Sequence, residues 1–376
     1  MEKEKDYYIL SEEEYNNHNF KKALFYININ LKLHPNDHLS YLLKGNIESY
    51  LNKYEKSIIS YQKGIKINPN NSKIHNDLSF SFSKINKYNS ALLETERAIN
   101  LNPYYEDAYF NKGIYLFKLK SLKKSIEVFS YLLSLNENYF EAYLQKGLIF
   151  IVLNNFEEAL NEFNKYITYV NNNIDAYFQL GFVYSKLKKY NEAIDIFKLV
   201  INNNFFYPNV HFNIGLCYIE IENYDKAIYE FNIVLAQNKN DLISLNKRAS
   251  CYIKLKHFNH AIHDYNKIIE INKNDSDVYF NKAICLCNLK NYFEAKKFFV
   301  KAIKLNSTNE FYYHYYGTCL IKIGKYKDAI EMFEKEKSIK NNNLSSSKSS
   351  INFFNKVPLY NKKLIPSKTK LNIFHK

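Results

Sequence analysis

The chain has 376 residues, of which 46% are hydrophobic, and a formal net charge of +14. This length suffices for two or three ordinary domains. It also suffices for one continuous repeat array, whose length is not limited by the size of a single hydrophobic core. The scarcity of glycine and proline, with 8 and 6 copies, disfavours β-rich folds and glycine-lined phosphate loops. No apolar stretch approaches the roughly 20 residues that span a bilayer, and the polar N-terminus lacks the apolar region of a signal peptide. We therefore expect an intracellular protein, cytoplasmic or nuclear, with no membrane span.

Prolines mark the first repeats of the chain. Pro35, Pro69 and Pro103 are each separated by 34 residues. Continuing that step divides residues 4–343 into ten repeats without insertion or deletion. The repeats, numbered from the N-terminus, are residues 4–37, 38–71, 72–105, 106–139, 140–173, 174–207, 208–241, 242–275, 276–309 and 310–343.

Two positions of the repeat carry only small residues. When each repeat is numbered from 1 to 34, positions 4, 8 and 11 share one helical face, and positions 20, 24 and 27 share a face of a second helix. Small residues at 8 and 20 let the two helices cross closely, while large residues at 4, 11, 17 and 24 fill the space beside them. Position 8 holds Ser11, Gly45, Ser79, Gly113, Gly147, Gly181, Gly215, Ala249, Ala283 and Gly317. Position 20 holds Ala23, Ser57, Ala91, Ser125, Ala159, Ala193, Ala227, Ala261, Ala295 and Ala329.

This pattern resembles the tetratricopeptide repeat, which has small residues at positions 8 and 20, aromatic residues at 17 and 24, and a proline at 32. The resemblance covers residues 4–343. It implies an all-α fold, an α-solenoid superhelix of ten 34-residue helix–turn–helix repeats, in a protein that binds other proteins. The chain departs from the family pattern at position 4, where tyrosine is frequent and tryptophan never occurs, and at 32, where proline is missing after the third repeat.

The last segment, residues 344–376, breaks the repeat. It contains seven lysines and no acidic residue, which accounts for +7 of the chain's +14. This composition is typical of a disordered segment, although its aromatic residues leave docking on the last repeat open. We expect a basic C-terminal tail that is either simply solvated or an arm for an acidic partner, nucleic acid or a membrane surface.

Cysteine and histidine do not predict a metal site. Cysteines at the same position of neighbouring repeats lie about 10 Å apart, too far for a disulfide or for shared zinc. His257, His260 and His263 are the best metal candidate, and a histidine-rich polar helix face is the alternative. No nucleophile elbow, Walker loop or dinucleotide fingerprint occurs, so we expect no metal, no cofactor and no enzyme. The cysteines at position 10 are Cys217, Cys251, Cys285 and Cys319.

Side-chain amides form a row at position 6. In tetratricopeptide solenoids the first helices line the concave groove, so the resemblance implies that this position faces the ligand. An amide can bond both the N–H and the C=O of a peptide backbone, whatever the peptide's side chains; a solvated, asparagine-rich helix face is the alternative. We predict that the row binds an extended segment of a partner protein. It consists of Asn111, Gln145, Gln179, Asn213 and Asn281, and Lys247 interrupts it in repeat 8.

Phenylalanine and lysine recur on the same predicted face. The phenylalanines at position 5 predict either an apolar groove surface or partial burial against the neighbouring repeat. The lysines at position 13, with acids at position 2, predict either electrostatic contacts with a partner or stabilisation of the helix dipole. Position 5 holds Phe110, Phe178, Phe212 and Phe280. Position 13 holds Lys84, Lys118, Lys186, Lys254 and Lys322, and position 2 holds Asp107, Glu141, Asp175 and Asp277.

The leading functional hypothesis is a non-enzymatic protein-interaction scaffold or adaptor, acting alone or as a subunit of a larger complex. A co-chaperone clamp for chaperone C-terminal carboxylates is not expected, because no three consecutive repeats match its pattern; in repeat 3, Asp77 stands where arginine is required. One alternative is a nucleic-acid- or polyanion-associated protein that acts through its basic tail, with affinity that falls steeply with salt. Another is a substrate-selecting subunit for a separate glycosyltransferase-like enzyme.

Overall fold

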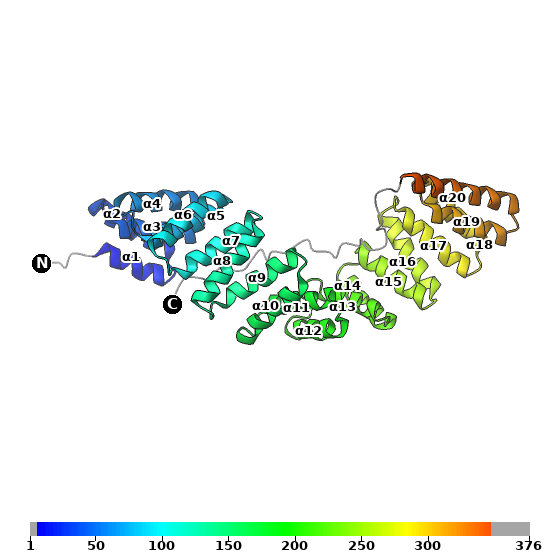
Figure 1. Cartoon of the computed structure of the whole chain (residues 1–376), viewed down its shortest axis with the longest axis horizontal. Helices are drawn as coiled ribbons and strands as arrows, with labels where there is room; N and C mark the ends of the chain where they lie inside the picture. The colour runs from blue at the N-terminus through cyan, green and yellow to red at the C-terminus, as the bar shows by residue number, and fades with distance from the viewer. Residues whose placement is uncertain (1–5, 347–376) are drawn as a thin grey trace. The chain divides into compact units, whose positions relative to one another are not determined.

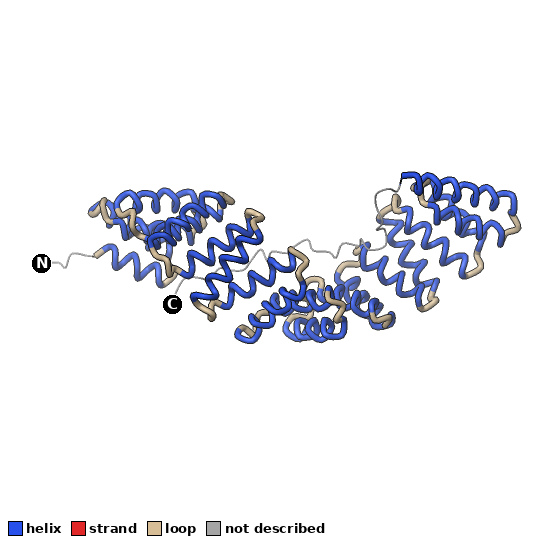
Figure 2. The backbone as a smooth tube through the Cα atoms, in the orientation of Figure 1, coloured by secondary structure: helices blue, strands red, loops and turns tan. Residues whose placement is uncertain are grey.

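Two helices form in every repeat. The computed structural model describes residues 6–346, and that part of the chain contains helices and no strand (Figure 1, Figure 2). In repeat 3, for example, α5 (Ser72–Lys84) occupies positions 1 to 13 and α6 (Tyr88–Leu101) occupies positions 17 to 30. The predicted all-α fold of helix–turn–helix repeats is confirmed.

The chain divides into two compact units, Met1–Asn223 and Tyr224–Lys376. The boundary lies inside repeat 7, between its first and second helices, a division that the repeat pattern does not predict. The N-terminal unit contains α1 (Tyr7–Asn16), α2 (Phe20–Leu33), α3 (His38–Tyr50), α4 (Tyr54–Ile67), α5, α6, α7 (Glu106–Lys118), α8 (Leu122–Leu135), α9 (Phe140–Val152), α10 (Phe156–Tyr169), α11 (Ile174–Lys186), α12 (Tyr190–Asn203) and α13 (Val210–Glu220).

The C-terminal unit runs from the second helix of repeat 7 to the end of the array. Its last helix continues to Ser346, beyond the predicted array boundary at residue 343. The rest of the predicted tail, residues 347–376, lies outside the described residues. The helices of this unit are α14 (Tyr224–Gln237), α15 (Leu242–Lys254), α16 (Phe258–Ile271), α17 (Ser276–Asn288), α18 (Tyr292–Leu305), α19 (Glu310–Lys322) and α20 (Tyr326–Ser346).

Position 15, in the turn between the two helices of a repeat, has a positive φ in all ten repeats. The angle lies between 58° and 62° at the nine residues that are not glycine, and is 82° at Gly324. The next residue donates its N–H back into the first helix, as Lys53 does to the Glu48 carbonyl at 2.8 Å, which ends the helix in the Schellman manner. The turn residues are His18, Asn52, Asn86, Lys120, Asn154, Lys188, Glu222, Lys256, Lys290 and Gly324.

The small residues at positions 8 and 20 meet, as predicted. Ser125 Oγ, at position 20, donates to the backbone carbonyl of Gly113 at 2.6 Å. The same glycine also lies directly under the aromatic ring at position 24, because a Cβ added there would be 2.5 Å from Phe129. The first helix therefore approaches a ring of the second helix so closely that no side chain fits between them.

Candidate functional site

First helices form a continuous surface in the N-terminal unit. Each of α5, α7, α9, α11 and α13 contacts the next in the series, so their position-6 side chains follow one another along this surface. Four of the predicted amides lie here, one per helix, and each is half-buried. In chain order these amides are Asn111, Gln145, Gln179 and Asn213.

Two of these amides already bond within the chain. Asn111 Nδ2, on α7, donates to Asn76 Oδ1 on α5 at 3.0 Å. Asn213 Nδ2 donates to the backbone carbonyl of Asn209 at 2.9 Å. The first bond shows that side chains of neighbouring first helices reach one another across this surface.

The other amides of the row are open. Gln145 and Gln179, on the neighbouring helices α9 and α11, have no hydrogen-bond partner among residues 6–346. Asn281 on α17, in the C-terminal unit, is likewise half-buried and without a partner in the described chain. The amide donors and acceptors of these side chains are therefore not used by any other described residue.

Asp77 occupies position 6 in repeat 3, directly before the amide row. Its side chain is only 2% exposed, and its Oδ2 has no hydrogen-bond partner within the described residues. Burial is the main reason why the pKa of this carboxyl is raised to about 7, against the opposing attraction of Lys73. In the sequence Asp77 stands out only as a departure from the chaperone clamp, whereas in the structure it continues the row at position 6.

An apolar row accompanies the amides at position 9, three residues further along each first helix. Residues three apart share a helix face, so each apolar side chain lies next to its amide. This row was not among the predicted site residues, although a large apolar residue recurs there in five consecutive repeats. The half-buried members are Phe80, Ile114, Leu148, Phe182 and Leu216.

Lysines lie at the C-terminal ends of these helices. Lys84 Nζ is 4.7 Å from the ring centroid of Phe80, and Lys186 Nζ is 5.4 Å from that of Phe182. Burial lowers the pKa of both lysines. None of the five predicted lysines forms an ion pair with a described residue. The other three are Lys118, which is half-buried, and Lys254 and Lys322, which are exposed.

The acids at position 2 differ from the lysines, because three of the four accept a hydrogen bond from a tyrosine. Two of these tyrosines stand at the end of the same repeat, just before the next first helix. These two bonds tie the end of a repeat to its own first helix, and the third bond joins repeat 10 to repeat 9. The pairs are Tyr139–Asp107 at 2.9 Å, Tyr207–Asp175 at 2.5 Å and Tyr312–Asp277 at 2.5 Å.

The phenylalanines at position 5 are covered by their own chain. Phe110 is 3% exposed and its ring centroid lies 5.7 Å from that of Phe129. Phe212 is also buried. Phe178 and Phe280 are half-buried, each near a tyrosine ring, with centroid distances of 5.0 and 4.8 Å. The cited ring neighbours of Phe110 and Phe178 belong to their own repeats, whereas Phe280 packs against the next repeat, as the second alternative expects.

Basic residues at position 7 point toward the second helices. In the N-terminal unit, Lys146 Nζ lies 2.9 Å from Glu162 Oε1, and both side chains are largely buried. In the C-terminal unit, Arg248 donates to both carboxylate oxygens of Asp264 at 2.9 and 2.5 Å, and to Asn232 Oδ1 of the preceding repeat at 2.6 Å. These pairs were not predicted, although a basic residue at position 7 with an acid at position 23 marks them in the sequence.

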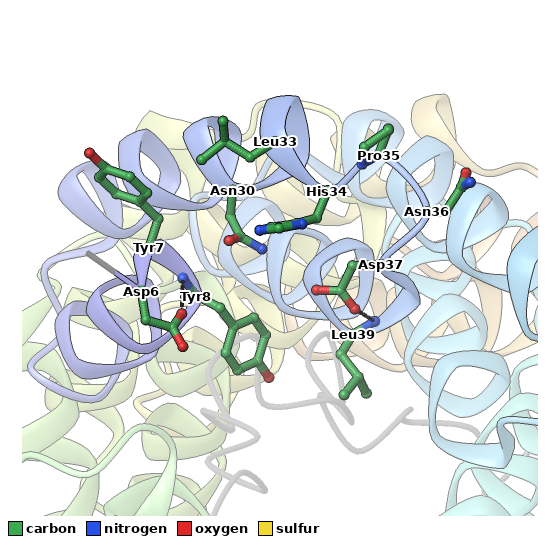
Figure 3. A pocket seen from close by; sticks show the side chains of 10 residues that line it. All are labelled: Asp6, Tyr7, Tyr8, Asn30, Leu33, His34, Pro35, Asn36, Asp37 and Leu39. Carbon is green, nitrogen blue, oxygen red and sulfur yellow. Dashed lines mark hydrogen bonds between the residues drawn. The ribbon is translucent and has the colours of Figure 1, made fainter. Parts of the chain in front are cut away.

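A pocket of about 940 Å³ opens at the N-terminal end, between the start of α1, the end of α2 and the start of α3 (Figure 3). Its acidic side chains serve the local fold. Asp6 Oδ1 accepts from the Tyr8 N–H at 3.0 Å and Asp37 Oδ1 from the Leu39 N–H at 3.0 Å, which caps the two first helices. No predicted site residue lines this pocket.

The cysteines at position 10 are buried. Burial raises the pKa of Cys217 and of Cys285 to about 12. The ring of His260 stacks on Tyr252 at 5.0 Å, and residues 6–346 contain no group of three side chains placed to hold a metal ion. None of the helices described is long and apolar enough to cross a membrane.

Comparison with known proteins identifies the repeats. A model of the tetratricopeptide repeat matches residues 39–71, 140–172, 174–205 and 243–275. A model described as anaphase-promoting complex, cyclosome, subunit 3 matches residues 265–336. No curated protein sequence matches the chain.

Solved structures share the fold. The crystal structure of PilW, a widely conserved type IV pilus biogenesis factor, has a TM-score of 0.51 at 19% identity, covering 54% of this chain and 94% of that one. A tetratricopeptide repeat protein from Parabacteroides merdae has a TM-score of 0.47 at 18% identity, with 66% and 98% covered. YrrB, a TPR protein with an unusual peptide-binding site, has a TM-score of 0.42 at 20% identity, with 49% and 95% covered.

Proposed function

Because the chain belongs to the tetratricopeptide-repeat family, we propose that it is a protein-interaction scaffold. Its first helices in the N-terminal unit bind an extended segment of a partner protein. The observation that carries this proposal is the pair of open amides, Gln145 and Gln179, on neighbouring helices beside the apolar row of position 9.

The spacing of the surface suits an extended chain. Neighbouring first helices lie on the order of 10 Å apart, and an extended chain advances about 3.3 Å per residue. One amide therefore meets about every third residue of the ligand and bonds its backbone. Leu148 and Phe182, on the same two helices, offer apolar contacts to the ligand's side chains, and Lys186, which lacks an ion-pair partner among the described residues, offers a positive charge.

The test removes the two open amides together. Gln145→Ala with Gln179→Ala is expected to lower partner capture at least tenfold, measured by quantitative mass spectrometry after affinity purification. The melting temperature should stay unchanged, because neither side chain has a partner in the described structure. The matched control is Gln62→Ala with Asn161→Ala, two exposed amides on second helices. Equal capture by both double variants would show that Gln145 and Gln179 do not contribute to partner binding.

A second and compatible candidate is a subunit of a larger assembly. It is favoured by the match of residues 265–336 to the model of a subunit of a multi-protein complex. Size-exclusion chromatography of a native lysate tests it: a scaffold that is a stable subunit elutes far ahead of its own 44.8 kDa mass. Elution at the mass of the free chain would leave only transient binding.

A further inference from the structure

Three second helices of the N-terminal unit expose large apolar side chains to water. At positions 22 and 30, each of α2, α4 and α6 has an exposed isoleucine, leucine or phenylalanine. These two positions are about 12 Å apart along one side of the helix. Similar repeats stack in the same orientation, so equal positions of neighbouring repeats lie on the same side of the array. The six residues form the apolar face of repeats 1–3 and are Phe25, Leu33, Ile59, Ile67, Leu93 and Leu101.

Packing within the chain does not account for this face. At position 22, Phe25, Ile59 and Leu93 are 61%, 55% and 51% exposed, although water disfavours such side chains. A run of exposed apolar residues in three successive repeats is typical of a surface that a partner covers. Position 22 is polar in the next three repeats, where it holds Glu127, Asn161 and Asp195.

Lysines surround the apolar side chains on two of these helices. Together α2 and α4 contain six lysines and one glutamate, and all seven side chains are exposed. Among the described residues only Lys22 of these lysines forms an ion pair, with Glu14. A partner that fits this face is therefore both apolar and negatively charged. The lysines are Lys21, Lys22, Lys32, Lys56, Lys63 and Lys66.

Anionic lipid bilayers combine these two properties. Their headgroups attract lysines, and apolar side chains enter the boundary of the acyl chains to a depth of about 5–10 Å. Nucleic acid and other polyanions offer charge without such an apolar layer. A second copy of the same face would bring lysines opposite lysines, which repel one another.

We propose that the apolar face of repeats 1–3 docks the chain on the surface of an anionic membrane, with Phe25, Ile59 and Leu93 inserted among the lipids. The lysines of α2 and α4 contact the headgroups, and the second helices lie on the bilayer without crossing it. The face belongs to second helices, whereas the amide row belongs to first helices, so this inference does not rest on the proposed function.

A tryptophan at position 22 tests the insertion directly, because the chain has no tryptophan of its own. The full chain with Phe25→Trp is mixed with vesicles of phosphatidylcholine and phosphatidylserine, or of phosphatidylcholine alone. Its fluorescence is expected to shift to shorter wavelength by several nanometres with the mixed vesicles only, because the ring leaves water. The matched control is Asn161→Trp, at the same position of repeat 5 and also exposed, whose emission should stay unchanged. An unshifted emission of Phe25→Trp overturns the proposal, even where the vesicles bind the chain through its basic C-terminal tail.

Sedimentation with the mixed vesicles measures how much the face contributes to binding. Phe25→Glu with Ile59→Glu is expected to lower the partition coefficient by roughly tenfold or more. The control is Tyr229→Glu with Phe293→Glu, which makes the same change in charge at two exposed aromatic residues of the C-terminal unit. Melting curves of both variants should match that of the natural chain, because all four side chains are exposed.

Two outcomes of the sedimentation experiment overturn the proposal. One is equal partitioning of the two double variants. The other is a natural chain that does not bind the vesicles, but captures an acidic protein and loses that capture when Phe25 and Ile59 are changed.

Discussion

Asp77 is a carboxyl where its neighbours along the row carry amides. It is almost wholly buried and one of its oxygens has no partner in the described chain, so the charged form is costly and its pKa is raised to about 7. In the unfolded chain the same group titrates near 3.9. Between these two values the folded protein holds a proton that the unfolded chain has lost, and stability therefore falls as pH rises.

The variant Asp77→Asn is expected to remove this pH dependence. The pKa of this carboxyl differs by about three units between the folded and the unfolded chain. Its ionisation therefore lowers the free energy of unfolding by up to about 4 kcal/mol between pH 4 and pH 8. The asparagine variant should match the natural chain near pH 4 and exceed it by a few kcal/mol at pH 8, measured by urea unfolding across that range. Parallel pH profiles for the two proteins would show that Asp77 titrates normally.

At the scale of the helix pair, the glycines at position 8 set the distance between the helices. A Cβ would meet the ring at position 24 at 2.5 Å in Gly113, 2.7 Å in Gly181 and 3.0 Å in Gly147. Alanine favours a helix over glycine by about 1 kcal/mol, but overpacking a core costs about 1–3 kcal/mol. The outcome at each position depends on which effect is larger.

Glycine-to-alanine variants should therefore destabilise the array in a fixed order. Gly113→Ala is expected to cost most, Gly181→Ala less and Gly147→Ala least, with about 1–3 kcal/mol for the first. Helical circular dichroism during denaturation measures each effect, and Asn161→Ala, at an exposed helix position, controls for helix propensity. A gain in stability at Gly113, or the reverse order, would contradict the close contact with the ring.

The repeat itself could be predicted from the sequence, because its signals are local and periodic. Small residues occupy positions 8 and 20 in all ten repeats, and an aromatic residue occupies position 24 in eight of them, so the same packing arrangement is indicated repeatedly. The positive φ at position 15 was harder to see: Asn52 and Gly324 are residues that tolerate this angle, whereas Lys188 is not distinguished from any solvated lysine. At Lys188 the fold imposes the positive φ, and the residue type does not indicate it.

The candidate site could be predicted only in part. The positions of the amides follow from the repeat number, but which of them is open does not. Asn111 is bonded to Asn76 of the neighbouring helix, and Gln145 has no partner in the described structure, although both looked equivalent. Hydrogen bonds between repeats depend on side-chain reach across about 10 Å, which no periodic pattern within one repeat encodes.

For the whole molecule, the distribution of charge predicts that polyanion binding and partner capture depend on different parts of the chain. Residues 347–376 carry seven lysines and no acid. Deleting them is expected to abolish retention on heparin at low salt, because these lysines are half of the net charge. Partner capture by the amide row should remain. Heparin retention is measured as the salt concentration at which the chain elutes. The melting curve of the shortened chain is the control, because it reports whether the helical array is intact.

Two results of that deletion would change the view of the tail. An unchanged elution salt would place polyanion binding on the helical array instead. A large drop in melting temperature would make the segment a structural cap of the last repeat, since α20 ends at Ser346 and the cut begins directly after it.

The buried ion pairs affect which helices can pack against each other while the chain folds. Ten repeats with the same core positions are nearly interchangeable, so a folding chain can stack a helix against the wrong neighbour with little apolar penalty. The basic side chains of Lys146 and Arg248, however, need an acid at position 23 of the second helix, as Glu162 and Asp264 supply. Packing against a second helix without that acid leaves a buried charge unpaired, which costs about 3–5 kcal/mol. We therefore expect these pairs to disfavour packing against a second helix that has an apolar residue at position 23, as repeat 6 does at Ile196.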